Sequence, residues 1–529
     1  MSARQFLVCI GLLATLAAGA FPPAESKPAA PSVAPLQQSR SFAVHVSEIG
    51  GSFDLAFDPR DQYELIVSSL GDASQTFHVQ LEAAPRAAVE RFPAVPVAPL
   101  SRTAAGWAVP TSAYRTELPR ETVGTARPAG LHSTRSQAQL GNVSSAAPLR
   151  EIQPDRFHHP AASDSSRRRF FLHVTAGPLE DPGAYVPITG VLAGEGQHVR
   201  IYVDSDLSAG DLAPELVSET IRLLDAEIIP RSRELIGIHA DVDGDDKLAV
   251  LVTPWLGRLC GGRVSLNGCV RSNDFQIGME APFGNSADLL YLNSHLESGP
   301  TLKTLLAHEY THAVCFSRRC AQERGSLPLE DDWLNEAIAY VAENLHETGW
   351  SNLEDRIAGY LAAPHRSPLV VRDYYCAGLW RDPGCRGATY LFLRFCVDQF
   401  GPELLGELVR SPLTGLRNLE QATGIPFRIL FRHWTIALAN DEIATVPLRS
   451  TLGNRQLSGV SRINWHIDNT PCPVELHGTT MSLIRLETAT CGVRRIAIHA
   501  PPAAQLQMTL LRRRVPETPA EAAGHSASR

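Results

Sequence analysis

Two histidines one helical turn apart, with a glutamate beside the first, constrain this chain more than any other feature of its sequence. They lie in the segment Leu305-Leu306-Ala307-His308-Glu309-Tyr310-Thr311-His312, which no glycine or proline interrupts. On a helix, His308 and His312 project from one face, where their ring nitrogens can reach a single metal ion. Glu309 lies about 100° further around the helix and can reach a water molecule held by that ion. We therefore predict a helix over Leu302–Cys315 that carries a metal site.

The same residues also have a plainer interpretation, in which two core histidines accompany a surface glutamate. His308 and His312 share the predicted helix face of Leu305 and Cys315, so burial alone would account for them. The choice depends on a third ligand, because a catalytic zinc ion takes three protein ligands and one water molecule. A third histidine six residues after His312 is excluded, since Arg318 stands there.

A glutamate on a second predicted helix, Asp332–His346, supplies the missing ligand. Glu336 lies in the run Trp333-Leu334-Asn335-Glu336-Ala337-Ile338, where an unpaired carboxylate among apolar side chains would be costly to bury. Binding a cation removes that cost, so we predict Glu336 as the third ligand. The rival ligands in the same region are Glu330, Asp331, Asp332, Glu343 and His346.

His-Glu-Tyr-Thr-His followed by Trp-Leu-Asn-Glu-Ala resembles the gluzincin clan of zinc metallopeptidases and, more narrowly, the hyicolysin-type neutral metallopeptidases. Three flanking segments are similar as well: the turn 241–245, the strand 289–293 and the helix 387–392. The likeness covers roughly residues 195 to 440, and Ala337 stands where such families often carry glycine. The resemblance implies zinc (Zn2+), endopeptidase activity and a two-lobed, zincin-like catalytic domain with its site between the lobes.

A hydrolytic mechanism follows from these residues. Zinc polarises the scissile carbonyl and activates water, while Glu309 acts as general base and later protonates the leaving amine. The oxyanion needs a further donor, for which we favour Tyr390 on the family-like helix. The strand Ala287–Asn293 is expected to pair with an extended peptide substrate. The other candidate oxyanion donors are Tyr374, Tyr375, His365 and His433.

A second metal site is suggested by Asp241, Asp243 and Asp245, which follow the first half of a D-x-D-x-D calcium loop. The second half departs from that loop, because Asp246 stands in place of glycine at position six and Val252 in place of glutamate at position twelve. The alternatives are therefore bound Ca2+ and a solvated turn ahead of a strand.

The order of the predicted elements favours an α+β fold, because strands precede helices in the central part of the chain. Alternating apolar residues before and after that part indicate small β-rich regions. The expected divisions are a signal peptide at 1–20, an N-terminal β-rich region at 21–82, a Pro/Ala/Ser-rich linker or pro-region at 83–168, the catalytic domain at 169–445, a C-terminal β domain at 446–515 and a disordered tail at 516–529.

The N-terminus is typical of a secretory signal. Arg4 precedes the apolar run Phe6–Ala18, and Ala18-Gly19-Ala20 forms a cleavage site. We therefore expect a secreted or periplasmic protein in which neighbouring cysteines form local disulfides. The expected pairs are Cys260–Cys269, Cys315–Cys320, Cys376–Cys385 and Cys472–Cys491, with Cys396 buried in a helix.

The overall charge excludes one class of partner. Lys+Arg number 48 against 56 Asp+Glu, a net charge of −8, which leaves no basic surface for nucleic acid. No later segment is apolar enough to span a membrane, so we expect no membrane span in the mature chain. We also expect a monomer that acts on protein or peptide substrates. The alternative function is an exported, non-catalytic binding or adhesion protein with a structural metal site. A further possibility is a latent enzyme whose residues 21–168 cover the cleft and are removed on activation.

Overall fold

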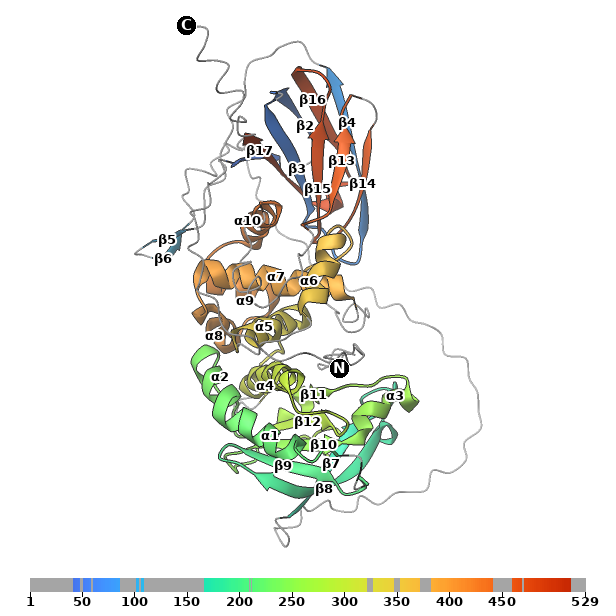
Figure 1. The fold of residues 1–529 in the computed structure, drawn as a ribbon, viewed down its shortest axis with the longest axis vertical. Helices are drawn as coiled ribbons and strands as arrows, with labels where there is room; N and C mark the ends of the chain where they lie inside the picture. The colour runs from blue at the N-terminus through green and yellow to red at the C-terminus, as the bar shows by residue number, and fades with distance from the viewer. Residues whose placement is uncertain are drawn as a thin grey trace, which may run out of the picture.

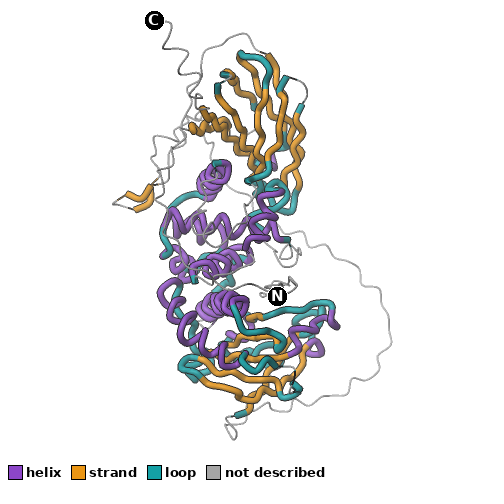
Figure 2. Tube along the Cα trace, in the orientation of Figure 1, coloured by secondary structure: helices purple, strands orange, loops and turns teal. Residues whose placement is uncertain are grey.

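The structure is a computed structural model, and it combines sheets and helices in an α+β arrangement. It describes residues 41–47, 51–85, 101–108, 166–320, 327–346, 353–371, 382–440 and 459–514, with gaps at 59, 104–105, 209, 211 and 469–470. Strands gather at the two ends of the molecule and helices fill its middle (Figures 1 and 2). The α+β fold class predicted from the order of the elements is therefore confirmed at this level.

A mixed sheet forms one end of the molecule. Its strands follow the order β11-β12-β10-β9-β8-β7, in which β9, β10 and β12 run parallel and the others antiparallel. The apolar run of β10 is buried along its whole length, as its central position predicts. The strand bounds are Arg167–His173 (β7), Tyr185–Glu195 (β8), Val199–Asp204 (β9), Leu248–Thr253 (β10), Gly268–Val270 (β11) and Leu289–Asn293 (β12).

Two helices connect this sheet to the rest of the chain. The helix α4, Pro300–Cys320, packs along β11 and β12 on one side and against α5, Asp332–Leu345, on the other (Figure 1). Both helices were expected from the sequence. Before them, α1 (Leu216–Leu223), a π-helical turn (Leu224–Ile228) and α2 (Ile229–Leu235) form one helical stretch, and the short α3 covers Leu259–Gly262.

The remaining helices pack beyond α5. A Cβ atom on Gly387 of α7 would lie 2.1 Å from the carbonyl oxygen of Arg356 in α6, so glycine lets these two helices touch through their backbones. Their bounds are Leu353–Ala362 (α6), Pro383–Phe400 (α7), Glu403–Arg410 (α8), Gly415–Thr423 (α9) and Phe427–Ala439 (α10).

A single β-sandwich stands at the other end of the molecule, and it corrects the prediction of two separate β regions. One sheet has the order β1-β17-β3-β15-β13 and the other β14-β4-β16-β2, so each sheet interleaves strands from both ends of the sequence, and only β15 and β13 are neighbours from the same end. The bounds are Ser41–Ser47 (β1), Ser52–Phe57 (β2), Asp61–Ser69 (β3), Thr76–Pro85 (β4), Arg462–His466 (β13), Cys472–His477 (β14), Met481–Glu487 (β15), Gly492–His499 (β16) and Leu506–Arg514 (β17).

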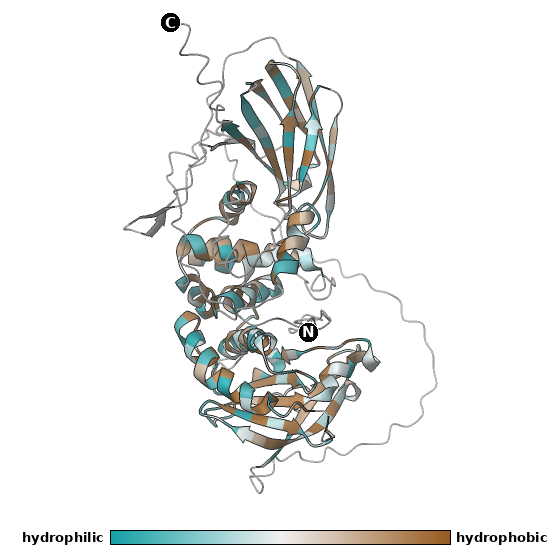
Figure 3. Cartoon of the chain, in the orientation of Figure 1, coloured by the Kyte–Doolittle hydropathy of each residue, from teal (hydrophilic) through white to brown (hydrophobic). Residues whose placement is uncertain are grey.

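The interleaving has a physical cause in the alternating pattern itself. Strands β4 and β14 bury alternate residues and therefore one face only, whereas β3, which α10 also contacts, is buried along most of its length. The hydropathy of the residues alternates along the strands of the sandwich in Figure 3. A half-buried face needs a partner sheet, and the two ends of the chain supply it to each other. The buried Glu64 of β3 adds a polar link, since it accepts from Arg462 Nε at 2.8 Å and pairs with Arg513 Nη2 at 3.1 Å. Both arginines also donate to the carbonyl of Ala439, which ends α10.

The structure corrects three of the four expected disulfides. Cys260, Cys269, Cys315, Cys320, Cys385, Cys396, Cys472 and Cys491 are all free. Cys315 and Cys320 lie five residues apart on α4 and so project from different sides of the helix. Cys396 is buried in α7, as expected.

Several sequence predictions lie outside the described residues. These are the signal peptide, most of the 83–168 segment, the tail 516–529, Tyr374, Tyr375 and Cys376. Within the linker the described parts are the end of β4, the start of β7 and a small hairpin of β5 (Ser101–Thr103) with β6 (Gly106–Ala108). None of the described helices combines the length and apolar character needed to cross a membrane.

Candidate metal centre

His308 and His312 converge as their spacing predicted. Both are buried on α4, at 1% and 0% exposure, and their Nε2 atoms lie 3.1 Å apart. Two ligands held at zinc distance in a tetrahedral arrangement would lie about 3.4 Å apart. The two imidazoles are therefore placed to share one ion.

Glu336 of α5 completes the group. Its Oε1 lies 3.4 Å from His312 Nε2 and its Oε2 lies 3.8 Å from His308 Nε2. All three side chains are buried, and their ligand atoms lie within 4.8 Å of one another. The structure thus brings together the three residues that the sequence analysis selected, and this group could bind a metal ion.

Helix α4 approaches β11 closely on the side of the helix that carries Leu305 and Glu309. A Cβ atom on Gly268 of β11 would lie 3.2 Å from Leu305 Cδ2, so the missing side chain lets the helix approach the strand. Glu309 follows Leu305 by four residues and faces the same way. Burial raises the pKa of the Cys269 thiol on β11 well above its usual range, and the Glu309 carboxylate adds to that rise. Glu309 is therefore a fully buried carboxylate beside the edge strand.

Glu343 holds one of the two histidines in place. Its Oε1 accepts from His308 Nδ1 at 2.6 Å, which leaves Nε2 of that ring free to act as a ligand. The Arg356 guanidinium lies 3.7 Å from the same oxygen and 4.3 Å from the centroid of the Tyr340 ring. His312 has no such support, because its Nδ1 finds no hydrogen-bond partner among the described residues.

The role of Glu343 was missed from the sequence, where it was only a rival ligand. Its spacing of seven residues from Glu336 on one helix is a signal that could have found it, because such residues share a face. The rival Glu330 is excluded as a ligand, since it pairs with Arg319 at 3.0 Å and accepts from Gly415 N at 2.6 Å.

The pKa values of His308 and Glu336 are both shifted in the direction that favours the charged form of the side chain. Burial lowers the pKa of His308, but the hydrogen bond to Glu343 and the nearby carboxylates outweigh it and leave the pKa raised. Burial raises the pKa of Glu336, yet the hydrogen bond and charge of His312 and the charge of His308 outweigh it, so this pKa is lowered. The carboxylate thus remains ionised beside the two imidazoles.

The role of Tyr390 as oxyanion donor stays a prediction, because no hydrogen bond in the described part of the chain links it to the metal group. It is completely buried on α7, and its hydroxyl has no hydrogen-bond partner among the described residues. Tyr340 is nearer, because its ring centroid lies 5.2 Å from that of His308. Burial raises the pKa of Tyr340; Arg386 opposes this rise, and the Glu336 carboxylate adds to it. The sequence analysis did not single out Tyr340.

Two other candidates lie away from the metal group. The backbone carbonyl of His365 accepts from His477 N at 3.1 Å, which places this residue beside the sandwich. His433 lies on α10, the helix that contacts β3 and β17. Both positions associate these histidines with the sandwich, so the structure gives neither a role as oxyanion donor.

The acidic turn differs from the expected calcium loop in one member. Asp245 turns away to pair with Arg200, and its Oδ1 accepts from Lys247 N at 2.9 Å. Asp288, which directly precedes β12, joins Asp241 and Asp243 instead. The group that could bind a metal ion is therefore Asp241, Asp243 and Asp288.

The donor set at the first site fits zinc, because two imidazole nitrogens and a carboxylate oxygen are typical ligands of that ion. Comparison with known proteins adds no family: no protein-family model matches the chain, and no curated protein matches it either.

Proposed function

We propose that this protein is a secreted, zinc-dependent endopeptidase. The observation that carries the proposal is the convergence of His308, His312 and Glu336 from two helices, with the buried Glu309 one residue after the first histidine. A purely structural site needs three or four ligands but has no use for a carboxylate at the position of Glu309.

A zinc ion held by these three side chains supplies a Lewis acid for the scissile carbonyl and lowers the pKa of water towards neutrality. Glu309 accepts the proton of the attacking water and later delivers it to the leaving amine. Glu343 fixes the orientation and tautomer of His308 through the 2.6 Å hydrogen bond. Tyr340 and Tyr390 are the candidate donors to the oxyanion, and we favour Tyr340 because its ring lies against His308.

The substrate main chain is proposed to pair with β11 rather than β12. The earlier expectation for the strand Ala287–Asn293 was wrong, because β12 has β11 on one side and β10 on the other. Strand β11 forms the edge of the sheet in the described part of the chain, and it contacts α4, the helix that carries Glu309. An extended peptide on that edge would run past the general base.

Metal analysis and one substitution test the proposal. The purified protein is expected to contain one zinc ion per chain and to cleave casein, with cleavage stopped by 1,10-phenanthroline. Glu309→Gln is expected to keep the zinc and to lose activity by about 10²–10⁴-fold, the usual contribution of a general base. Glu407→Gln, on the exposed face of α8, serves as the matched control and should retain full activity.

Three results of these experiments would contradict the proposed peptidase. Full turnover by Glu309→Gln would refute the general-base role. Bound zinc without cleavage of casein or of a peptide library would favour the exported, non-catalytic binding protein. If the protein binds no zinc after reconstitution, the assignment of the metal site is refuted, and the proposed peptidase activity is refuted with it.

Export is tested separately, because it depends on residues 1–20. We expect the mature chain to begin near Phe21, which mass spectrometry of the exported protein would detect. An exported protein that retains Met1–Ala20 would contradict the cleavage.

A further inference from the structure

The acidic turn before β10 and the residue before β12 meet at one end of two parallel strands. Ala249 of β10 is paired with Leu289 of β12, and Ala249 N donates to Asp288 O at 2.9 Å. Asp288 therefore lies beside the turn that carries Asp241 and Asp243, although the sequence separates them widely. The ligand atoms of these three residues lie within 4.8 Å of one another.

Asp288 is a buried carboxylate directed at this turn. Its side chain is 0% exposed, and its Oδ1 accepts from Val242 N at 3.1 Å. Its Oδ2 has no hydrogen-bond donor in good geometry, although His239 Nε2 lies 3.1 Å away. A negative charge with one bare oxygen is costly to bury unless a cation compensates it.

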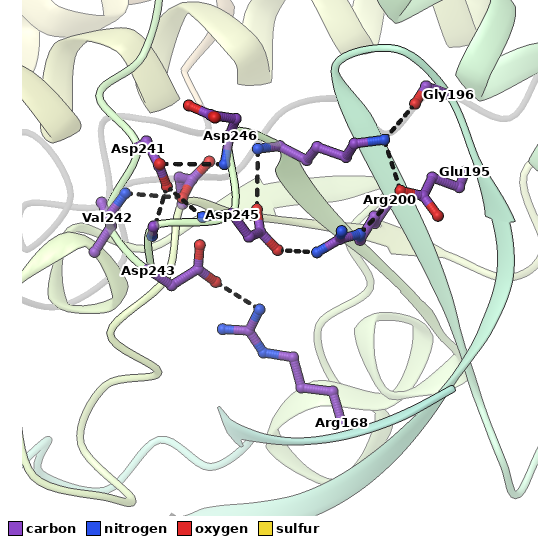
Figure 4. A network of polar contacts seen from close by, with 12 residues as sticks. Arg168, Glu195, Gly196, Arg200, Asp241, Val242, Asp243, Asp245 and Asp246 are labelled. Atoms are coloured by element: carbon purple, nitrogen blue, oxygen red, sulfur yellow. Dashed lines mark hydrogen bonds and ion pairs between the residues drawn. The ribbon is translucent and has the colours of Figure 1, made fainter. Parts of the chain in front are cut away.

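The other two aspartates are held in position by neighbours (Figure 4). Asp241 accepts from Gly244 N at 2.8 Å through Oδ1 and from Asp246 N at 3.1 Å through Oδ2. Asp243 Oδ2 pairs with Arg168 Nη1 at 2.6 Å. These contacts fix the positions of the two carboxylates, and each carboxylate oxygen can still accept from a further partner through its second lone pair.

The charges at this place do not balance. Three carboxylates lie together here, and Arg168 forms an ion pair with one of them, Asp243. Burial raises the pKa of Asp243; Arg168 opposes that rise, and the Asp288 carboxylate adds to it. A divalent cation would remove this mutual repulsion.

We propose that Asp241, Asp243 and Asp288 bind one calcium ion, separate from the zinc site. Carboxylate oxygens in an irregular turn suit calcium, which accepts six to eight oxygen ligands in flexible geometry, whereas zinc prefers nitrogen and sulfur donors. The ion fastens the turn to the start of β12. His239 extends this link to α4, because its Nδ1 lies 2.9 Å from the hydroxyl of Tyr310, the residue after Glu309.

Calcium binding to the zinc-loaded protein tests this site directly. Isothermal titration calorimetry is expected to show one Ca2+ per chain, with a dissociation constant of about 10⁻⁴–10⁻³ M and weaker binding of Mg2+. Saturating Ca2+ should raise Tm by about 3 °C. Asp288→Asn and Asp243→Asn should each weaken Ca2+ binding at least tenfold.

Asp245→Asn is the matched control, because Asp245 belongs to the same turn but pairs with Arg200. This variant should bind Ca2+ within about twofold of the unchanged protein. If Asp288→Asn fails to fold by circular dichroism, Asp243→Asn decides the question. The proposal is overturned if Ca2+ does not bind saturably, if neither variant weakens its binding, or if Asp245→Asn abolishes it.

Discussion

The Glu343 carboxylate and the His308 imidazole form a buried hydrogen bond of 2.6 Å between α5 and α4. The bond joins the two helices that carry the metal group, so one contact both positions a ligand and holds the site together. It also fixes which nitrogen of His308 faces Glu336 and His312.

Removal of this hydrogen bond should weaken metal binding. We expect Glu343→Ala to reduce zinc affinity by about 10–100-fold, because His308 loses the group that orients its ring. Competition with a chromophoric chelator measures the affinity. Glu407→Gln should not change it, and an unchanged affinity in Glu343→Ala would assign Glu343 a purely packing role.

Tyr340, whose ring lies nearest the metal group of the tyrosines considered, should affect kcat more than KM. If Tyr340 donates to the oxyanion, Tyr340→Phe should lower kcat by about 10²–10³-fold with little change in KM. Tyr390→Phe should leave kcat nearly unchanged, because the Tyr390 hydroxyl forms no hydrogen bond among the described residues. A loss of kcat in Tyr390→Phe alone would restore the original prediction.

Acid should destabilise the protein through a buried histidine. Burial, aided by Arg231 and Lys303, lowers the pKa of His346 to about 4. The unfolded chain therefore binds more protons than the folded one between pH 6.5 and 4, and stability falls as pH falls through this range. The full effect is about 3 kcal/mol. Urea unfolding at several pH values should show a smaller acid loss in His346→Gln than in the unchanged protein; equal losses would contradict this shift.

The two chain ends should remain together after a cut between them. Strand β3 lies between β17 and β15, and β4 lies between β14 and β16. A protease site engineered within 109–165 and then cleaved should give two fragments that co-elute in gel filtration and separate only in denaturant. Removal of residues 21–168 would take β1 to β4 out of the sandwich and open both sheets, so we expect the N-terminal strands to be retained. Spontaneous separation of the fragments under native conditions would contradict it.

The contact between α6 and α7 should not tolerate a methyl group. We expect Gly387→Ala to cost about 3 kcal/mol of unfolding free energy, because its Cβ would clash with the Arg356 carbonyl, which is backbone and cannot rotate away. Gly210→Ala is the control, since a Cβ there meets nothing within 4 Å. Chemical denaturation compares the two, and equal stabilities would mean that the helices separate without cost.

Local sequence patterns were sufficient for the helices α4 and α5 and for the first metal group. The spacing of His308 and His312 and the apolar run around Glu336 depend on neighbours along one helix, so periodicity alone predicts which faces they share. Cys396 was placed in a buried helix for the same reason.

Pairing between strands that are distant in the sequence decided the sandwich, the edge strand and the composition of the acidic group. The same alternating pattern fits two small domains or one interleaved sandwich, and only the register of β3 with β15 and β17 distinguishes them. Sheet order placed β12 inside the sheet and β11 at its edge, and it brought Asp288 to the acidic turn in place of Asp245. Strand neighbours are chosen by the burial of whole faces, an energy that sums over residues distant in the chain. The sequence by itself therefore determined which donor groups form the first metal group, whereas the tertiary structure decided what surrounds them.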